Sequence, residues 1–165
     1  MTDHPDKARR VIQLEIDELQ RLHGRLDGSF SEAVELLQKA LAAGRKIVVV
    51  GIGKSHNIGH KIAATLNSTG ATSVVLNSQN ALHGDLGVVG DGDIVLALSY
   101  SGETAELLDI LPALRRFDVD VIALTGAADS TLARNSDVVL DTSVEREACP
   151  LGLAPTSSSL SLIHI

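Results

Sequence analysis

The sequence is poor in cysteine, in aromatic residues and in long apolar runs, and each shortage excludes a class of protein. Cys149 is the only cysteine among 165 residues, which excludes an internal disulfide and a multi-cysteine zinc site. Only 2% of the residues are aromatic, so aliphatic side chains must form the core. No apolar run approaches the roughly 18 residues that span a bilayer, and the charged N-terminus has no apolar signal segment. We therefore expect a cytoplasmic protein without a membrane anchor, a redox framework or a structural metal.

The net charge of the chain is negative, which limits the partners that it can bind. The sequence has 21 acidic and 14 basic residues, and residues 46–165 hold 13 of the acids and 7 of the bases. No basic stripe interrupts this second part, so we expect no binding to nucleic acid or to a membrane. An anionic small molecule would need donors directed at it locally. With 44% apolar residues in a chain of this length, we expect one soluble globular core.

The pattern of apolar residues changes at about residue 45 and predicts two kinds of structure. Residues 6–22 and 29–41 each place apolar side chains on one helical face, so we expect an N-terminal helical hairpin. After residue 45, short aliphatic runs without polar alternation predict parallel strands that are buried on both faces. These runs cover residues 46–50, 73–76, 94–98, 119–124 and 138–140. Helical stretches separate most of them, at 58–68, 105–116 and 129–134. The sequence therefore predicts a doubly wound α/β fold, a three-layer αβα sandwich with a five-stranded parallel sheet.

Two glycine-containing turns follow predicted strands and are suited to bind a phosphate. In residues 51–55 (Gly-Ile-Gly-Lys-Ser), the glycines let the backbone approach an anion at a helix start, and the lysine adds a positive charge. Residues 99–104 (Ser-Tyr-Ser-Gly-Glu-Thr) offer three hydroxyl groups around a glycine. Val48 stands where a Walker loop needs a glycine, and Asn77 stands where a dinucleotide site needs an acid, so a nucleotide is disfavoured. An ordinary strand-to-helix turn and a helix-capping cluster are the plainer interpretations.

Five segments of the chain together carry a family signature. They are residues 51–55, 63–70, 83–87, 99–104 and 147–158. With the residues between them, over roughly 8–159, they closely resemble the sugar isomerase (SIS) domain of arabinose 5-phosphate isomerases. The resemblance implies a flavodoxin-like fold and a cofactor-independent enzyme that interconverts D-ribulose 5-phosphate and D-arabinose 5-phosphate through an enediol. In that family the product commonly supplies 3-deoxy-D-manno-octulosonate synthesis for lipopolysaccharide, and the members are commonly homotetramers.

The resemblance also implies roles for individual residues. Lys54, Glu106 and Glu147 match the family's catalytic positions. Glu147 would then be the proton shuttle and Lys54 the electrostatic stabiliser, while Glu106 would position the substrate or Lys54. These residue types suit a proton transfer between C1 and C2, which needs a base, an acid near the carbonyl oxygen and groups that bind the phosphate. The implied substrate-binding residues are Gly53, Ser55, His83, Ser99, Ser101, Gly102, Thr104, Thr156 and Ser157. No metal ligand is implied.

Each of these candidates also has a plainer interpretation. Lys54 and Glu106 can be ordinary residues of a first helical turn, and Glu147 follows Glu145 in a charged run that is typical of a solvated surface. A lone loop histidine such as His83 is more often a structural hydrogen-bonding group than a catalyst. At the level of function, the chain can be a noncatalytic phosphosugar sensor, or an isomerase of another phosphosugar that uses the same turns.

The sequence departs from the family pattern beside the first turn and towards its end, where the family's further catalytic histidine, in a Ser-His-Pro-Gly-Gly stretch, lies beyond the point at which the resemblance stops. The family usually has Gly-His where His56 and Asn57 stand, and an arginine where His60 stands, so a larger side chain lies beside the first turn. The resemblance stops at about residue 159, and we expect residues 160–165 to be a non-native tail in place of the last helix. The expected organisation is therefore N-terminal helices over 1–45, packed on the domain or a neighbouring subunit, an SIS domain over 46–159, and this tail.

Overall fold

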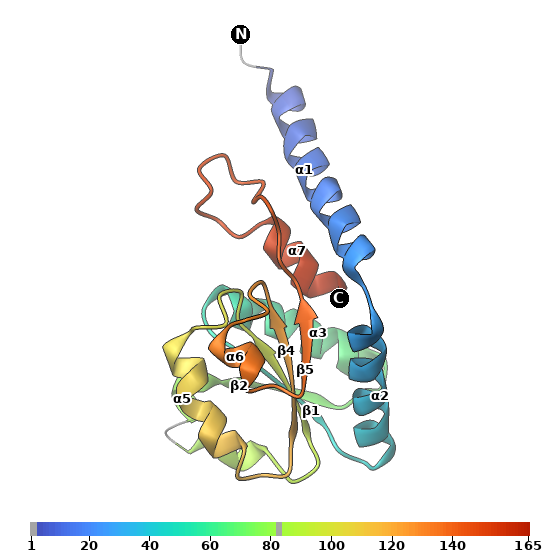
Figure 1. The fold of residues 1–165 in the computed structure, drawn as a ribbon, viewed down its shortest axis with the longest axis vertical. Coiled ribbons are helices and arrows are strands. Elements are labelled where there is room, and N and C mark those ends of the chain that lie inside the picture. Colours follow the sequence, from blue (N-terminus) through green and yellow to red (C-terminus); the bar gives the residue numbers. More distant parts are fainter. Residues whose placement is uncertain (1–2, 82–83) are drawn as a thin grey trace.

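A computed structural model describes residues 3–81 and 84–165 and has a five-stranded sheet at its centre (Figure 1). The strands are β1 (Ile47–Gly51), β2 (Ser73–Asn77), β3 (Ile94–Leu98), β4 (Asp120–Thr125) and β5 (Val138–Asp141). All neighbours run parallel, in the order β2-β1-β3-β4-β5. Each strand lies within one residue, at either end, of the aliphatic run that predicted it. The predicted α/β fold is confirmed.

Helices cover both faces of this sheet. One face carries α2 (Gly28–Ala42), α3 (Lys54–Ser68) and α7 (Ser157–His164). The other face carries α5 (Ala105–Leu114) and α6 (Thr131–Arg134), together with the short α4 (Ser78–Ala81) and η1 (Asp85–Val88). These layers are the predicted αβα sandwich. Within the two described ranges, none of the helices is both long and apolar enough to cross a membrane.

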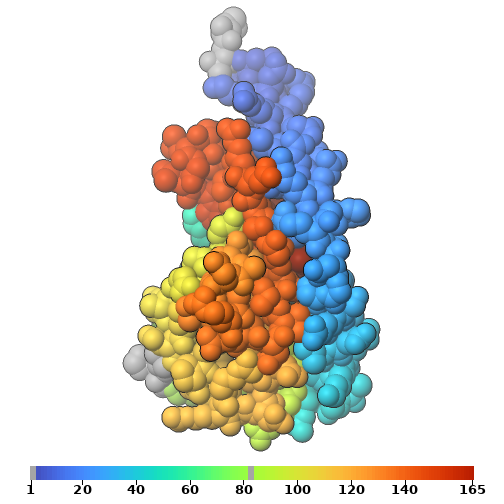
Figure 2. Space-filling view, in the orientation of Figure 1, coloured from blue at the N-terminus to red at the C-terminus, as the bar shows by residue number. Residues whose placement is uncertain are grey.

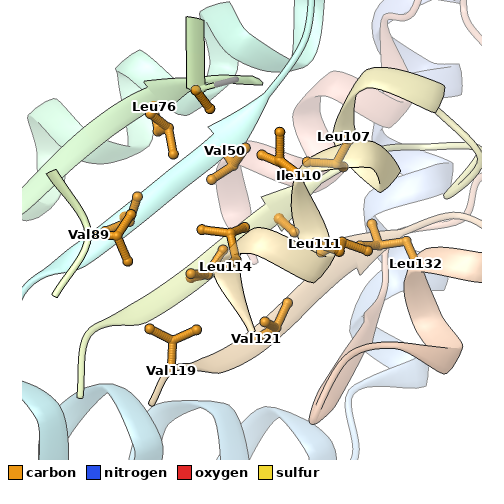
Figure 3. Close-up of a cluster of buried hydrophobic side chains, with 14 of the residues drawn as sticks. Val50, Leu76, Val89, Leu107, Ile110, Leu111, Leu114, Val119, Val121 and Leu132 are labelled. Carbon is orange, nitrogen blue, oxygen red and sulfur yellow. The ribbon is translucent and has the colours of Figure 1, made fainter. Parts of the chain in front are cut away.

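Alternate residues of each strand point to opposite faces of the sheet and divide the core in two. On one face, Val50 of β1, Val121 of β4 and Ile110 of α5 belong to one cluster of buried side chains, which Figure 3 shows. On the other face, Val49 of β1 belongs to a cluster that includes Leu162 of α7. The strands are thus buried on both sides, which explains why the aliphatic runs lack polar alternation. The buried side chains of both clusters are aliphatic, as the shortage of aromatic residues predicted.

The two N-terminal helices do not form the predicted hairpin. α1 (His4–Arg25) is joined to α2 by Leu26 and Asp27, both in extended conformations, and α2 continues away from α1 instead of folding back (Figure 1). α1 packs against α7, whereas α2 packs against β5 and β3. The helical character of this region is therefore confirmed, but the antiparallel pairing was wrong. Its physical reason is that α7, from the other end of the chain, occupies the face of α1 that a hairpin would have covered.

The last helix, α7, gives the C-terminal residues a place in the fold. It begins at Ser157, inside the hydroxyl-rich stretch that indicated a helix start, and it includes most of the residues predicted to be a tail. Its Leu162 is 5% exposed. Beside it, an apolar cavity of about 280 Å³ lies between α2, α3 and α7. The non-native origin of residues 160–165 stays a prediction.

Candidate functional site

The pairing of β1 with β3 positions both predicted phosphate turns. β2 lies on one side of β1 and β4 lies beyond β3, so the direction of winding reverses between β1 and β3. At such a switch point the connections leave to opposite faces and open a crevice at the carboxyl ends of the strands, where α/β proteins bind ligands. Gly51 pairs with Leu98 in the sheet. The turn that carries Lys54 and the turn that carries Ser101 therefore begin side by side at one edge.

Glycines allow the turn after β1 to enter α3 directly. Gly53 has a φ of 56° and occupies the N-cap of α3, where it makes no side-chain capping hydrogen bond. A Cβ atom on Gly51 would lie 3.1 Å from the carbonyl carbon of Ser55, so only glycine lets the helix start this close to the strand. α3 therefore begins at Lys54, earlier than predicted, with the positive end of its dipole uncapped by a side chain. Lys54 is exposed, and Ser55 is half-buried.

The hydroxyl groups of the loop after β3 form a network within the loop. The buried Ser99 hydroxyl lies 2.8 Å from the Thr104 hydroxyl and accepts a 3.1 Å hydrogen bond from the N–H of Gly102. Ser101 is exposed, and its hydroxyl accepts a 3.2 Å hydrogen bond from the N–H of Glu103. A hydroxyl that accepts one hydrogen bond can still donate one. The loop can therefore offer neutral donors to an anion at the start of α5.

The conformation of this loop depends on Gly102. Its φ is 63°, and a Cβ atom at this position would lie 2.0 Å from the Ser130 hydroxyl oxygen. The carbonyl oxygen of Gly102 accepts a hydrogen bond of 3.0 Å from the N–H of Leu132 in α6. The Glu103 carboxylate accepts one of 2.6 Å from the N–H of Thr131, and this hydrogen bond holds the pKa of Glu103 below its ordinary value. These two hydrogen bonds from α6 thus stabilise the conformation of the loop.

Glu147 binds the N-terminal end of α7 through both carboxylate oxygens, in a unit of Glu147, Thr156 and Ser158 that we call the Glu147 clamp. One oxygen accepts hydrogen bonds from the N–H and the hydroxyl of Thr156, at 2.7 and 3.0 Å, and a 3.4 Å one from the N–H of Ser158. The other oxygen accepts from the Ser158 hydroxyl. Partial burial acts to raise the pKa of Glu147, but these hydrogen bonds outweigh it and hold the pKa below its ordinary value. Glu147 is therefore ionised at neutral pH.

A buried acid from α1 fixes the backbone beside the clamp. Glu18 is 2% exposed, and its carboxylate accepts hydrogen bonds from the N–H groups of Glu145 and Arg146, at 3.0 and 3.2 Å. Arg21, one turn further along α1, donates to the same carboxylate at 2.8 Å and offsets its charge. Figure 2 shows the segment around residues 144–156 lying beside α1, above the body of the domain.

Tyr100 ties this segment to the loop after β3. Its hydroxyl accepts a 3.2 Å hydrogen bond from the N–H of Val144 and donates one of 3.3 Å to the carbonyl oxygen of the same residue. A Cβ atom on Gly126 would lie 2.6 Å from the Tyr100 ring, so the glycine makes room for it. Because Tyr100 also belongs to the second turn, one side chain connects the predicted phosphate loop with the segment that leads to Glu147.

Comparison with known proteins identifies the fold family. The sequence pattern of the SIS domain matches residues 40–163. The chain belongs to the SIS-domain family. This match spans both turns, the Glu147 clamp and most of α7, and it confirms the family that the motifs indicated.

The SIS domain is similar to proteins named as arabinose 5-phosphate isomerases. The whole chain is 48% identical over 157 residues to arabinose 5-phosphate isomerase KdsD of Pseudomonas aeruginosa, and 45% identical over 156 residues to arabinose 5-phosphate isomerase GutQ of Salmonella typhi. The matches cover 95% and 94% of this chain but 47% and 48% of those proteins. The chain thus spans about half the length of these relatives. The resemblance drawn from the motifs is confirmed.

Solved structures share this SIS fold closely. One is the Escherichia coli CFT073 protein c3406 in complex with A5P, which is 34% identical with a TM-score of 0.91. Another is a Bacteroides fragilis protein, a putative phosphosugar isomerase involved in capsule formation, which is 32% identical with a TM-score of 0.93. Each comparison covers 98% of this chain, and 86% and 84% of the other chain. The shared fold therefore extends over nearly the whole chain, α1 included.

The SIS domain brings some predicted site residues into direct contact and leaves others apart. Ser99 contacts Thr104, and Glu147 contacts Thr156, whereas Lys54 and Glu106 make no side-chain hydrogen bond or ion pair within the described residues. The buried Ser157 hydroxyl has no partner in the same part of the chain. His83 lies outside the described residues.

Two residues of this arrangement were missed in the sequence. Ser158 binds Glu147 next to the predicted Thr156 and Ser157, and the hydroxyl-rich helix start was the signal for it. Glu18 had a clearer signal, because it stands between Leu14 and Leu22 at spacings of four residues. An acid in such an apolar stripe is buried with its partners when the helix packs.

Proposed function

We propose that this SIS domain is the isomerase part of an enzyme that interconverts D-ribulose 5-phosphate and D-arabinose 5-phosphate. The observation that carries the proposal is the meeting of two glycine-containing turns at neighbouring strand ends, in a domain that also holds an ionised glutamate at α7. The names of the KdsD and GutQ relatives support this substrate, as does the A5P complex of the E. coli protein c3406.

In this proposal the two turns hold the phosphate. The first turn contributes Gly53, Ser55 and the open N-terminus of α3, and Lys54 adds a full positive charge. The second turn contributes backbone N–H groups around Gly102 and the hydroxyls of Ser99, Ser101 and Thr104. Neutral donors of this kind bind an anion without a basic surface. A phosphosugar can therefore bind to a protein that is acidic overall.

The proposed reaction moves one proton between neighbouring carbons. A base removes the proton from C2 of arabinose 5-phosphate while the C1 carbonyl oxygen gains a proton, which gives an enediol. Return of a proton to C1 and loss of the C2 hydroxyl proton then give ribulose 5-phosphate, so no oxidant and no cofactor are consumed. Glu147 carries the proton, Lys54 stabilises the negative charge that develops on oxygen, and Glu106 positions the substrate or Lys54.

The hydrogen bonds of the Glu147 clamp bear on this role. Both carboxylate oxygens already accept hydrogen bonds from Thr156 and Ser158. To take a proton from carbon, one oxygen must direct a lone pair to the substrate, and exchange of a hydrogen-bond donor for the substrate is one way to provide it. Release of a donor also weakens the cause of the lowered pKa, which brings the carboxylate closer to the basicity that proton transfer needs. In the same proposal Thr156 and Ser157 close the pocket at α7, and His83 contributes a further polar group.

The test is an assay of D-ribulose 5-phosphate conversion to D-arabinose 5-phosphate by the 165-residue chain, together with phosphosugar binding. Ser101→Ala should weaken binding by about 1–3 kcal/mol, because a hydrogen bond to a charged group is lost. Ser136→Ala is the matched control, since its hydroxyl donates to a backbone carbonyl oxygen in α6. Unchanged binding in Ser101→Ala would remove this residue from the site.

A second function, a noncatalytic phosphosugar sensor, is favoured by one observation. The Glu147 carboxylate is engaged with α7, which is what a structural cap requires. In that case the chain binds arabinose 5-phosphate but converts none of it. Binding without turnover, both by this chain and by a longer protein that contains it, would establish the sensor, and turnover of a different phosphosugar would change the substrate but keep the isomerase.

The finer parts of the proposal concern assembly and cellular role. Ile12 and Ile16 are 56% and 41% exposed on α1, part of which projects beyond the body of the domain (Figure 1). Exposed apolar side chains on such a helix support contact with further copies of the chain, and we propose a homotetramer. Light scattering should give the mass of four chains, and a monomer mass would contradict this.

We further propose a cytoplasmic role in supplying arabinose 5-phosphate for 3-deoxy-D-manno-octulosonate and lipopolysaccharide synthesis. Loss of the protein should then create a need for added arabinose 5-phosphate.

A further inference from the structure

Two histidines on α3 face each other with converging ring nitrogens. His56 and His60 are four residues apart, a spacing that places side chains on the same face of a helix. Their Nε2 atoms lie 3.1 Å apart, and the rings meet edge-on, with centroids separated by 4.6 Å and an angle of 86° between the planes. The proposed isomerase does not use either residue, and both stand where the resembling family usually has other residue types.

The surroundings of His56 favour the neutral form of its ring. Two ring nitrogens at hydrogen-bond distance can share one proton but cannot both carry one towards each other. Burial of the His56 ring lowers its pKa, and the charge of a protonated His60 lowers it further. A backbone hydrogen bond with Gly51 acts to raise this pKa but does not outweigh the two lowering effects. The ring of His56 is therefore more readily neutral than a free imidazole, and a neutral ring nitrogen can bind a metal cation.

We propose that His56 and His60 form a binding site for a transition-metal ion of the zinc type. Two histidines at i and i+4 of a helix are a known way to chelate zinc, and neutral imidazole nitrogen is a preferred ligand for such ions. Two zinc–nitrogen bonds of about 2.0–2.1 Å at a tetrahedral angle place the nitrogens roughly 3.3–3.4 Å apart. The rings therefore need to open by only a few tenths of an ångström, and His60 is exposed and free to move.

The site would be open rather than structural. Among residues 3–81 and 84–165, no group of three or more His, Cys, Asp or Glu side chains is placed to hold a metal ion. The remaining coordination positions would go to water, so the ion would bind reversibly. This makes the pair a site that responds to the available metal concentration, directly after Ser55 in α3. The argument for metal binding does not rest on the proposed isomerase activity.

The experiment is a zinc titration of the 165-residue chain by calorimetry, in a Cys149→Ser background that removes the thiol as a competing ligand. We expect one site, and His56→Gln and His60→Gln should each weaken zinc binding by about tenfold or more, because each removes one of two protein ligands. His23→Gln, on the exposed surface of α1, should leave the affinity unchanged.

Nitrogen NMR of the histidine rings gives an independent readout. Zinc should shift the Nε2 resonances of His56 and His60 together and leave those of His23 and His164 in place. The proposal is overturned if zinc does not bind, if binding survives either substitution undiminished, or if other histidine resonances shift instead. Circular dichroism of the folded variants shows that a loss of binding is not a loss of structure.

Discussion

The two turns at the sheet edge and the Glu147 clamp are built in different ways. Each turn is a short stretch between one strand and the next helix, and a glycine of positive φ sets its shape. The clamp needs residues at 147 and 156–158, and the backbone beside it is held by Glu18, which is 127 residues from Glu145. The proposed binding turns are thus encoded locally, whereas the proposed catalytic group depends on both ends of the chain.

This difference predicts that phosphosugar binding and turnover are separable. Substitutions in the turns should weaken binding, and substitutions around the clamp should slow turnover with little effect on binding. If the two regions act as one unit, substitutions in either should change both quantities together.

The largest effect should come from Glu147→Gln. We expect turnover to fall by about 10²–10⁴-fold, because the amide cannot accept the proton that general base catalysis transfers. The dissociation constant for arabinose 5-phosphate should change little, since the phosphate is held elsewhere. Parallel kinetic and calorimetric measurements of parent and variant test this. Equal turnover in both proteins would show that another group moves the proton.

The next effect should come from Gly102→Ala. The added Cβ would meet the Ser130 hydroxyl oxygen at 2.0 Å and would force an unfavourable positive φ on alanine. We expect a loss of roughly 1–3 kcal/mol in the free energy of unfolding, together with weaker phosphosugar binding. Gly24→Ala is the matched control, because a Cβ there meets no atom within 4 Å and α1 continues through the site. Urea denaturation gives the free energy of unfolding of both variants. Equal stability of Gly102→Ala and Gly24→Ala would contradict this account of the loop.

A smaller effect is expected from Glu18→Gln. The amide keeps one acceptor for the N–H groups of Glu145 and Arg146 but loses the ion pair with Arg21. The free energy of unfolding should fall by about 0.5–1.5 kcal/mol, since one hydrogen bond from a partly buried backbone donor is lost. Glu18 is a positioning residue in this account, so turnover should also fall while phosphosugar affinity stays the same. Glu35→Gln, on the exposed face of α2, should change none of these. A pure stability loss with unaltered turnover would restrict Glu18 to a structural role.

The smallest effect should appear in the pH dependence of stability. The hydrogen bonds of the clamp hold the pKa of Glu147 in the folded chain below its ordinary value of 4.5. Its contribution is therefore fully present above the unfolded pKa and is lost as the pH falls through the folded pKa. The stability difference between parent and Glu147→Gln should be constant above about pH 5 and should narrow below it. A difference that widens on acidification would reverse the assigned direction of the pKa.

The fold was predictable because its signals are local. Strands buried on both faces need continuous aliphatic runs, and the five runs marked the five strands. The two turns were predictable for the same reason, since glycine and hydroxyl residues act on their own stretch of backbone. The start of α3 was placed late, at Ile58 instead of Lys54, because the sequence does not show how closely Gly51 lets the helix approach the strand.

The partners of the clamp were harder to predict, because they are long-range. Nothing in residues 6–22 indicates that α7 will cover α1, and this is why the hairpin prediction failed. Glu145 and Arg146 are exposed, as their charged run suggested, but no local pattern indicates that their backbone N–H groups bind a buried acid from α1. Roles that depend on substrate, such as those of Lys54, Glu106 and Glu147, rest on the resemblance and stay predictions.

A crystal structure of the chain with D-arabinose 5-phosphate would test the central claim most directly. We predict a phosphoryl group in contact with residues of both turns, 53–55 and 99–104, and the C1–C2 end of the sugar directed to the Glu147 carboxylate. A phosphoryl group bound away from either turn, or a sugar whose carbonyl end points away from Glu147, would contradict the account.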